Sequence, residues 1–436
     1  MHYLLIFYKE CIMNYTALSK EAAKKEYDAL LEKYEECKAR GLKLDMSRGK
    51  PGRDQLDITM DMLDALSADD CVSEAGFDCR NYGLLDAVPE AKWLFAELLG
   101  LKDERIIVAG NSSLNLMYDA AVRAMLYGID GNTPWSKQDK VKFLCPAPGY
   151  DRHFAICESL GIEMITVPMT ENGPDMDIIE KLVSTDASIK GIWCVPKFSN
   201  PGGIVYSDET VKRFAALKPA APDFRIFWDN AYAVHDFDID NPVKLLNIFD
   251  EAEKLGNTDL IYYFASTSKI SFPGSGVAIM AASEKNIAEA KRVMTVQTIG
   301  YDKINMLRHV KYFKNADGVY RKMREHASII KPKFDAVLKT LDRELSSLGI
   351  AKWNSPLGGY FISLDVLDGT AKRVHSLMSE LGVTLTPAGA TFPYGNDPED
   401  KNLRIAPTFP PIDELKAASE VLCLCVKLAA LEKLYF

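Results

Sequence analysis

Residues 260–276 read Leu-Ile-Tyr-Tyr-Phe-Ala-Ser-Thr-Ser-Lys-Ile-Ser-Phe-Pro-Gly-Ser-Gly, an apolar run that ends in a hydroxyl-rich turn around Lys269. The apolar and aromatic residues predict a buried β-strand over 260–264 that delivers this lysine at its carboxyl end. A lysine placed in this way suits a reaction with a carbonyl group, and only the neutral amine performs that reaction. We therefore expect the site to lower the pKa of the lysine by desolvation or by a neighbouring cation.

Three further predicted strands also end in polar residues. They cover 105–109, followed by Gly110-Asn111-Ser112-Ser113; 191–195, which runs on to Asn200-Pro201-Gly202-Gly203; and 225–229, which ends at Asp229 and continues as Asn230-Ala231-Tyr232. Helical patterns alternate with these strands, at 90–99, 114–126 and 153–160. This alternation predicts an α/β fold with a mainly parallel sheet sandwiched by helices. Ligands of such sheets bind at the carboxyl ends of the strands, so we expect the polar ends to meet there.

The pattern changes from about residue 317 onward. A long charged helix, a strand, a helix, a second strand and a terminal helix are expected at 320–348, 359–364, 371–381, 404–406 and 413–434. This layout predicts a smaller α+β domain beside the larger one. We expect a large cofactor-binding domain over 61–316 and a small domain over 317–436. The N-terminal segment 1–60, with a helix over 19–40, is expected to join the small domain.

Composition excludes several classes of function. Of the 436 residues 47% are hydrophobic and 26% charged, and the net charge is −9, which argues against nucleic acid or an anionic membrane as partner. The nine cysteines form no CxxC pair, and no His/Cys cluster has the spacing of a metal site, so we expect no metal and reduced thiols in a cytoplasmic protein. The apolar stretch at 4–7 lacks a basic leader and a cleavage site, so a signal peptide is not expected, and Met13 is an alternative start.

The four strand ends together offer the parts of a pyridoxal-phosphate site. Lys269 would hold the cofactor as a Schiff base and move the α-proton of the substrate. Asp229 would pair with the pyridine nitrogen and keep it protonated. Asn200 and Tyr232 would hydrogen-bond the phenolic oxygen of the ring, which lowers the pKa of the Schiff base.

Other residues would hold the phosphate and the ring. Gly110, Asn111 and Ser112 precede a helix, whose free N–H groups bind phosphate, and Ser266 and Ser268 add hydroxyl donors. Tyr150 would stack on the ring, with His153 placed to support the aspartate. Each motif alone has a plainer interpretation as a turn, a helix cap or a surface charge. Their joint occurrence, each at a strand end, favours the cofactor site.

These motifs resemble those of the fold-type I pyridoxal-phosphate aminotransferases of the class I/II superfamily. The resemblance covers about 47–407 and rests on Asn200-Pro201-x-Gly203, Asp229-x-Ala231-Tyr232, Ser266-x-Ser268-Lys269, Tyr150-Asp151-Arg152-His153, Asn81-Tyr82-Gly83, Pro356-x-Gly358-Gly359-Tyr360-Phe361 and Asn402-Leu403-Arg404-Ile405-Ala406. The chain is most similar to the divergent bacterial aspartate aminotransferases, through Ser47-Arg48-Gly49-Lys50-Pro51, Gly110-Asn111-Ser112-Ser113-Leu114 and an arginine-free segment after the lysine.

The resemblance implies aspartate:2-oxoglutarate transamination by a ping-pong mechanism, with an amino acid and a 2-oxo acid as substrates. It implies that Arg404 binds the α-carboxylate of the substrate and that Gly49 lies on a loop that closes over it. It also implies a homodimer in which Tyr82 of one subunit reaches the phosphate held by its neighbour. Most superfamily members carry a phosphate-binding arginine seven or eight residues after the lysine, where this chain has Gly276 as the nearest equivalent. Asn111, Ser112, Ser266, Ser268 and the neighbour's Tyr82 are expected to compensate.

Some alternatives stay open. A second cation for a distal carboxylate could come from Arg48, Arg152, Lys303 or Arg308, each of which is more often a structural charge. An aminotransferase for an aromatic amino acid or alanine, or a C–S lyase, fits the same motifs. A cofactor-binding regulatory module without enzymatic activity would require a basic winged-helix segment ahead of Ser47, where we expect a single short helix.

Overall fold

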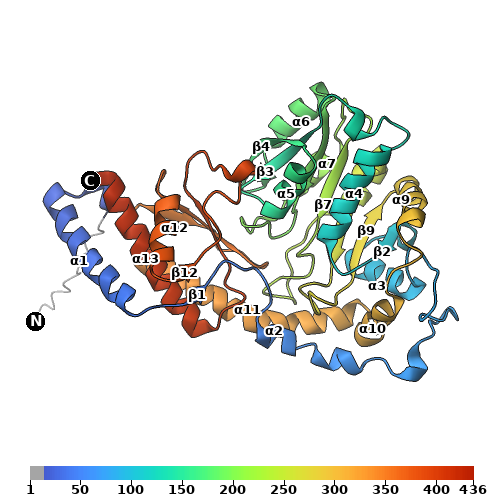
Figure 1. Ribbon diagram of the computed structural model, residues 1–436, viewed down its shortest axis with the longest axis horizontal. Coiled ribbons are helices and arrows are strands. Elements are labelled where there is room, and N and C mark those ends of the chain that lie inside the picture. Colours follow the sequence, from blue (N-terminus) through green and yellow to red (C-terminus); the bar gives the residue numbers. More distant parts are fainter. Residues whose placement is uncertain (1–13) are drawn as a thin grey trace, which may run out of the picture.

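The computed structural model describes residues 14–436, which form a larger and a smaller part connected along one long helix (Figure 1). The larger part, at the right of the figure, contains the main sheet, and the smaller part, at the left, contains α1 (Lys20–Ala39) and α13 (Ile412–Tyr435). The expectations for the apolar stretch 4–7 and for a start at Met13 lie outside the described residues.

An eight-stranded sheet forms the centre of the larger part, in the order β2-β9-β8-β7-β6-β3-β4-β5. Its strands are β2 (Ile106–Val108), β3 (Lys142–Ala147), β4 (Glu163–Thr170), β5 (Gly173–Pro174), β6 (Ile189–Cys194), β7 (Arg225–Asp229), β8 (Ile261–Ser266) and β9 (Ala278–Ala282). The strands from β8 to β4 run parallel, whereas the pairs β8–β9, β9–β2 and β4–β5 are antiparallel. The predicted mainly parallel sheet is therefore confirmed.

Helices cover both faces of this sheet because its central strands are apolar on both sides. On β7, Ile226 and Trp228 pack into one core and Phe227 into the other. The first core is covered by α3 (Pro89–Leu99), α6 (Met176–Thr185), α7 (Asp208–Ala215), α8 (Ile248–Leu255) and α10 (Lys303–Phe313). The second is covered by α4 (Ser113–Tyr127), α5 (Asp151–Ser159) and α9 (Glu284–Gln297).

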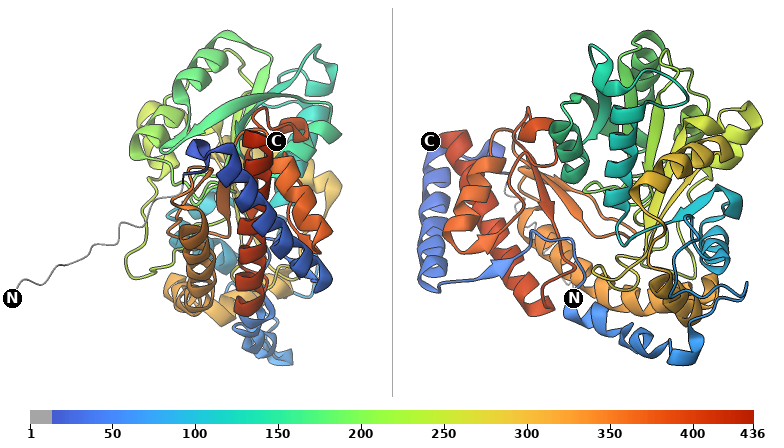
Figure 2. Two further views of the ribbon diagram at one scale, coloured as in Figure 1. Left: turned by 90° about the vertical axis from the view of Figure 1, so that its left-hand side faces the viewer. Right: turned by 45° about the vertical axis from the view of Figure 1, so that its right-hand side comes forward.

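The smaller part is built on a three-stranded antiparallel sheet, in which β11 lies between β10 and β13. Its elements are β10 (Ala351–Trp353), β11 (Ile362–Val366), β13 (Asn402–Ile405), the long α11 (Ala316–Leu345) and α12 (Ala371–Glu380). In both views of Figure 2, α1 packs beside α13, and β1 (Leu44–Asp45) pairs with β12 (Val383–Thr384). These contacts attach the N-terminal segment to the smaller part. The domain boundaries at 60 and 316 remain a prediction.

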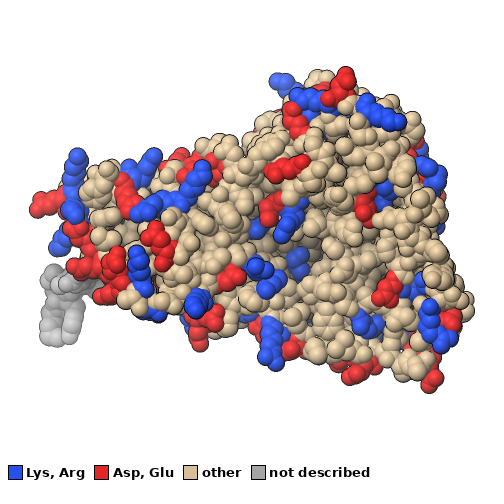
Figure 3. Space-filling model, viewed as in Figure 1, with Lys and Arg blue, Asp and Glu red and all other residues tan. Residues whose placement is uncertain are grey.

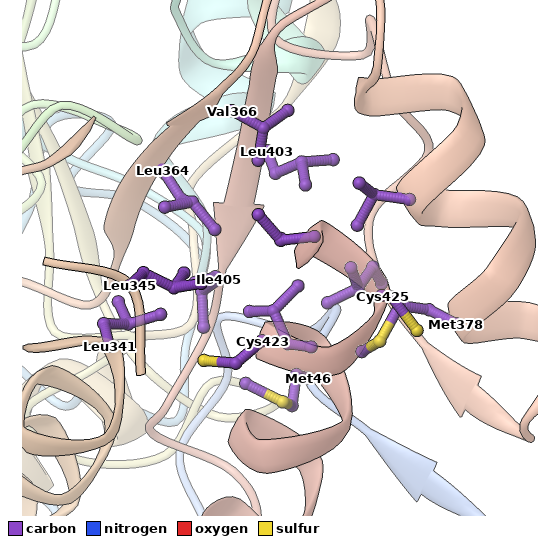
Figure 4. Packing of buried hydrophobic residues seen from close by; sticks show 14 of the residues in the cluster. Met46, Leu341, Leu345, Leu364, Val366, Met378, Leu403, Ile405, Cys423 and Cys425 are labelled. Atoms are coloured by element: carbon purple, nitrogen blue, oxygen red, sulfur yellow. The ribbon is translucent and has the colours of Figure 1, made fainter. Parts of the chain in front are cut away.

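The core of the smaller part fixes the direction of one candidate side chain. Leu403 and Ile405 of β13 point into the apolar cluster shown in Figure 4, together with Leu364 of β11. Successive side chains of a strand point to opposite faces. Arg404, between these two apolar residues, is therefore directed out of the core.

Most predicted elements lie close to their observed positions. The strand predicted over 225–229 has the same bounds as β7, whereas the helix predicted over 320–348 begins earlier, at Ala316. The side chain of Asn315 accepts a hydrogen bond from the Gly318 N–H at 3.0 Å and caps that helix. The short helix α2 (Arg53–Asp57) connects the N-terminal segment with α11. Within residues 14–436, every helix is too short or too polar to span a bilayer.

Candidate active site

A cavity of about 260 Å³ lies beside the carboxyl ends of β6, β7 and β8. Parallel strands bring their carboxyl ends to the same edge of a sheet, which explains why segments far apart in the sequence meet here. The residues lining it are Gly49, Ser112, Ser113, Leu114, Met117, Tyr150, Val195, Asn200, Asp229, Ala231, Tyr232, Ser266, Ser268, Lys269, Pro273 and Phe361. Nine of the predicted site residues are among them, from Gly49 to Lys269.

Lys269 lies in the turn that follows β8 and reaches into this cavity. Its Nζ is 4.9 Å from the centroid of the Tyr232 ring and 5.7 Å from that of Tyr360. Burial lowers the pKa of Lys269, and the nearby Asp229 carboxylate opposes this shift. Burial also raises the pKa of Tyr232 well above its usual value, so its hydroxyl keeps the proton that it can donate. The environment thus favours the neutral amine that carbonyl chemistry requires.

Three buried histidines hold the turn 267–271 that carries the lysine. His235 Nε2 and His326 Nε2 lie 3.4 and 3.0 Å from backbone carbonyl oxygens of this turn. His309 Nε2 lies 3.2 and 2.9 Å from two hydroxyl oxygens of the same turn. Burial lowers the pKa of all three imidazoles. The sequence analysis missed these histidines, although they come from helices and a loop with recognisable apolar patterns.

His153 holds the carboxylate of Asp229 in position through a hydrogen bond. The Nε2 atom of His153 is 3.1 Å from Asp229 Oδ2, and its ring stacks on Trp193 with a centroid distance of 4.6 Å. The other carboxylate oxygen, Oδ1, is buried and has no hydrogen-bond partner in the described part of the chain. A buried acceptor without a donor is costly. The donor that fits is a protonated ring nitrogen in the adjacent cavity, so these residues fit a pyridinium group.

One part of the cavity wall is rich in hydrogen-bond donors. Helix α4 begins at Ser113 with Ser112 as its N-cap residue, so its free N–H groups lie at the cavity. The Ser266 hydroxyl donates to Ser268 Oγ at 3.0 Å, and the Ser268 hydroxyl can donate to the Asn111 carbonyl at 3.2 Å. A helix N-terminus beside two hydroxyls is a suitable site for a phosphate. Gly110 and Asn111 directly precede Ser112 but do not line the cavity themselves.

The structure also explains the arginine-free segment after the lysine. A Cβ atom at Gly276 would lie 3.0 Å from both the Phe272 carbonyl oxygen and Thr267 Oγ1. A side chain at this position would therefore require the closely packed turn around it to shift. Arg308 of α10 instead approaches this segment from the other side and donates to Ser275 Oγ at 2.5 Å.

Arg404 lies at the edge of the cavity, next to two of its lining residues. Its Nη1 is 3.3 Å from Asn200 Oδ1 and its guanidinium carbon is 5.0 Å from the centroid of the Phe361 ring. A Cβ atom at Gly49 would lie 2.1 Å from Phe361 Cζ, so the glycine backbone touches the same ring. The Arg404 guanidinium and the Asn200 amide, which lie beside Phe361 and Gly49, can donate hydrogen bonds to one carboxylate.

Several predicted residues do not reach the cavity. Tyr82 is 78% exposed and lies away from it. Arg48 and Arg152 are also exposed, and buried Lys303 donates to a backbone carbonyl. None of the four basic candidates for a distal carboxylate lines the cavity. In residues 14–436 no three His, Cys, Asp or Glu side chains are grouped as metal ligands.

Comparisons with known proteins agree with this geometry. A family model described as aspartate amino-transferase matches residues 18–436. An aspartate aminotransferase from Corynebacterium glutamicum is 45% identical over 93% of this chain and 94% of its own length. The crystal structure of an aspartate transaminase from the same species superposes with a TM-score of 0.94, at 43% identity, and covers 97% of this chain and 99% of that one.

A more distant solved structure shows the same fold. It is the aspartate aminotransferase of Thermus thermophilus with maleate, which has a TM-score of 0.65 at 15% identity and covers 92% of this chain and 96% of its own. The predicted α/β fold and the predicted aminotransferase activity are therefore confirmed. On the family match across nearly the whole chain, this protein belongs to the aspartate aminotransferase family.

Proposed function

We propose that the protein transfers the amino group of L-aspartate to 2-oxoglutarate by a ping-pong mechanism, with pyridoxal 5′-phosphate held in the cavity. The observation that carries this proposal is the placement of Lys269 and the unpartnered Asp229 Oδ1 beside one cavity. Aspartate is favoured as the donor because the C. glutamicum relative at 45% identity is an aspartate aminotransferase.

The cofactor, when bound, supplies an aldehyde for the amino group and a cationic ring that withdraws electrons from the substrate Cα. Asp229, held by His153, would receive the ring N–H. Tyr150 would stack on the ring, and Asn200 and Tyr232 would donate to its phenolic oxygen. Ser112, Ser266 and Ser268 would hold the phosphate, supported by Gly110 and Asn111.

Lys269 would act as the base of the reaction. Its Nζ, whose pKa burial lowers toward the range in which a neutral amine can act, would take the proton from Cα of the amino acid and, in the reverse half-reaction, return one to Cα of the 2-oxo acid. Arg404 and Asn200 would bind the α-carboxylate, which fixes the Cα–H bond relative to the amine. The loop with Gly49 would cover this carboxylate and exclude water.

The protein would act as a cytoplasmic homodimer with Tyr82 of each subunit at the neighbouring site. Tyr82, Val296 and Ile299 are 78%, 83% and 63% exposed. They lie on one surface, because Gly83 and Gly300 pack so closely that a Cβ on Gly300 would be 2.5 Å from the Gly83 oxygen. Large exposed apolar side chains grouped in this way favour a contact with another subunit.

The distribution of charges on the surface is compatible with acidic substrates, although the net charge of the chain is −9. Figure 3 shows Lys and Arg side chains around a hollow in the middle of the displayed face, between the two parts of the molecule. A local positive field attracts a dicarboxylate irrespective of the total charge.

The test is the absorbance spectrum of the purified protein. A visible band should bleach on addition of L-aspartate and return with 2-oxoglutarate, and Lys269→Ala should abolish both changes. A panel of amino acids, each with 2-oxoglutarate, would separate aspartate from aromatic amino acids or alanine as donor. Dominant release of pyruvate from cystathionine would contradict transamination and indicate a C–S lyase.

A further inference from the structure

The guanidinium that should receive the substrate α-carboxylate already binds a carboxylate of the protein. Arg404 Nη1 donates to Asp151 Oδ1 at 2.7 Å and lies 3.3 Å from Asn200 Oδ1. Its Nε is 3.3 Å from Thr386 Oγ1. Within residues 14–436, Nη2 has no hydrogen-bond partner.

A substrate carboxylate and Asp151 compete for the same atom. A carboxylate that binds arginine bidentately accepts two parallel N–H bonds from neighbouring nitrogens of the fork. Asn200 lines the cavity and lies beside Nη1, so the Nη1–Nη2 edge of Arg404 is the edge next to the substrate. Both hydrogens of Nη1 are already directed at Asp151 and Asn200. A bidentate substrate must replace one of these two acceptors at Nη1. Two carboxylates at one nitrogen repel each other, whereas the neutral Asn200 amide can remain beside the substrate, so the acceptor that has to leave is Asp151 Oδ1.

The surroundings of Asp151 allow it to leave. Asp151 is the first residue of α5, and its side chain is 32% exposed, whereas that of Arg404 is 8% exposed. In the described part of the chain, Arg404 is the sole side chain that hydrogen-bonds the Asp151 carboxylate. Once released, Asp151 would turn into solvent and remain near the N-terminus of α5, which favours a negative charge. Thr386 and Phe361 would still hold the guanidinium in place.

We propose that Asp151 occupies the place of the substrate α-carboxylate on Arg404 and is displaced whenever a substrate binds. The proposal rests on the assignment of Arg404 to the α-carboxylate in the proposed function. Asp151 thus weakens the binding of every substrate, because it compensates the buried positive charge while the site is empty. It also links α5 of the larger part to β13 of the smaller part, so its release breaks an ion pair between the two.

The test is the isosteric variant Asp151→Asn in the full-length protein with its cofactor. We expect KM for the amino acid and for the 2-oxo acid to fall about two- to fivefold, as for the loss of one partly exposed ion pair. The value of kcat should stay within about twofold, because Lys269 and Asp229 are not touched. The Kd of maleate, a dicarboxylate that is not turned over, should fall by the same factor in an absorbance titration.

A matched control separates this effect from a general change of charge. Asp177 of α6 also lies in the first turn of a helix and receives a hydrogen bond from an arginine, Arg213, at 2.6 Å, far from the cavity. Asp177→Asn should leave KM and the Kd of maleate unchanged.

Two results for Asp151→Asn would overturn the proposal: a rise in KM, or no change in either KM or the Kd of maleate. Both are expected if Asp151 stays bound to Arg404 and only orients its guanidinium. Should the donor not be aspartate, the fall in KM would appear with whichever amino acid is turned over, since all carry an α-carboxylate. Failure of the substrate assignment and failure of this inference are therefore separate results.

Discussion

The contact between Gly49 and Phe361 predicts that one added methyl group weakens substrate binding. The ideal Cβ of an alanine at position 49 would lie 2.1, 2.5 and 3.0 Å from three atoms of the Phe361 ring. Carbon atoms in contact are normally about 3.5–4.0 Å apart, so the ring or the loop has to move by about 1.5 Å. The ring is buried, at 6% exposure, and lies against Arg404, which limits where it can go.

The magnitude follows from the cost of overpacking. Inserting one methyl group into a packed site typically costs about 1–3 kcal/mol. If about 1.4 kcal/mol of this cost is lost from the free energy of substrate binding, because Arg404 is displaced or the loop is opened, KM for both substrates rises about tenfold. The value of kcat should change less, because the Lys269 turn is held by separate contacts. We therefore expect a rise in KM with little change in the absorbance band of the cofactor.

Steady-state kinetics of Gly49→Ala, with aspartate and with 2-oxoglutarate, measure this effect. Phe361→Leu in the same chain removes the ring atoms that the methyl group meets and should restore part of the lost affinity. An unchanged KM in Gly49→Ala would show that the ring gives way freely and would refute the reasoning. An equal rise in KM with and without Phe361→Leu would show that the loop backbone, rather than the ring, is responsible.

Three further predictions concern residues in and around the proposed cofactor site. Burial lowers the pKa of His309 to about 4, so below pH 6.5 the unfolded chain binds a proton that the folded chain excludes. Stability should therefore fall by about 1 kcal/mol from this residue between pH 7.5 and 5.5, and urea unfolding of His309→Asn should show a correspondingly weaker pH dependence. Asp229→Asn should slow the aspartate half-reaction by about two to four orders of magnitude, because removing one partner of a buried ion pair costs about 3–5 kcal/mol. Stopped-flow absorbance measures this rate, and a loss below tenfold would contradict the role of Asp229. Arg308→Ala should raise the Kd of the cofactor about tenfold, because it frees the segment around Ser275, next to the serines that are proposed to bind the phosphate. Equilibrium dialysis measures this Kd. An unchanged Kd would show that the segment has no influence on cofactor binding.

The sequence predicted those parts of the site that depend on local patterns. Asp229 and Lys269 each follow a short apolar run rich in aromatic and β-branched residues, which predicts a buried strand from local composition alone. The parallel arrangement then brings their ends together, as observed for the cavity. The antiparallel β9 was not predicted between β2 and β8, although its segment 278–282 is an apolar run. Strand order depends on how the crossover connections pack, which no local pattern specifies.

Contacts between distant segments were beyond the sequence analysis. Asp151 and Arg404 are 253 positions apart, and their ion pair exists because the smaller part packs against α5. The sequence presents Asp151 only as a polar residue between the aromatic Tyr150 and His153. The histidines of α10 and α11 offered a weak signal, since a histidine on an apolar helix face is buried and needs a hydrogen-bond partner. Identifying that partner as the lysine turn requires the three-dimensional arrangement.

The two halves of the site differ in how they are held, and this difference separates binding from catalysis. Lys269 and Asp229 lie at the ends of central strands packed on both faces, with histidines bonded to the lysine turn and to the carboxylate. The proposed α-carboxylate site instead lies at the junction of the two parts, where a glycine loop contacts a ring and Arg404 pairs with Asp151, the ion pair that we propose a substrate replaces. A rigid reacting centre keeps the amine and the ring aligned, whereas an adjustable carboxylate site lets substrates enter and leave. Substitutions of the first group should therefore reduce kcat, and those of the second should change KM.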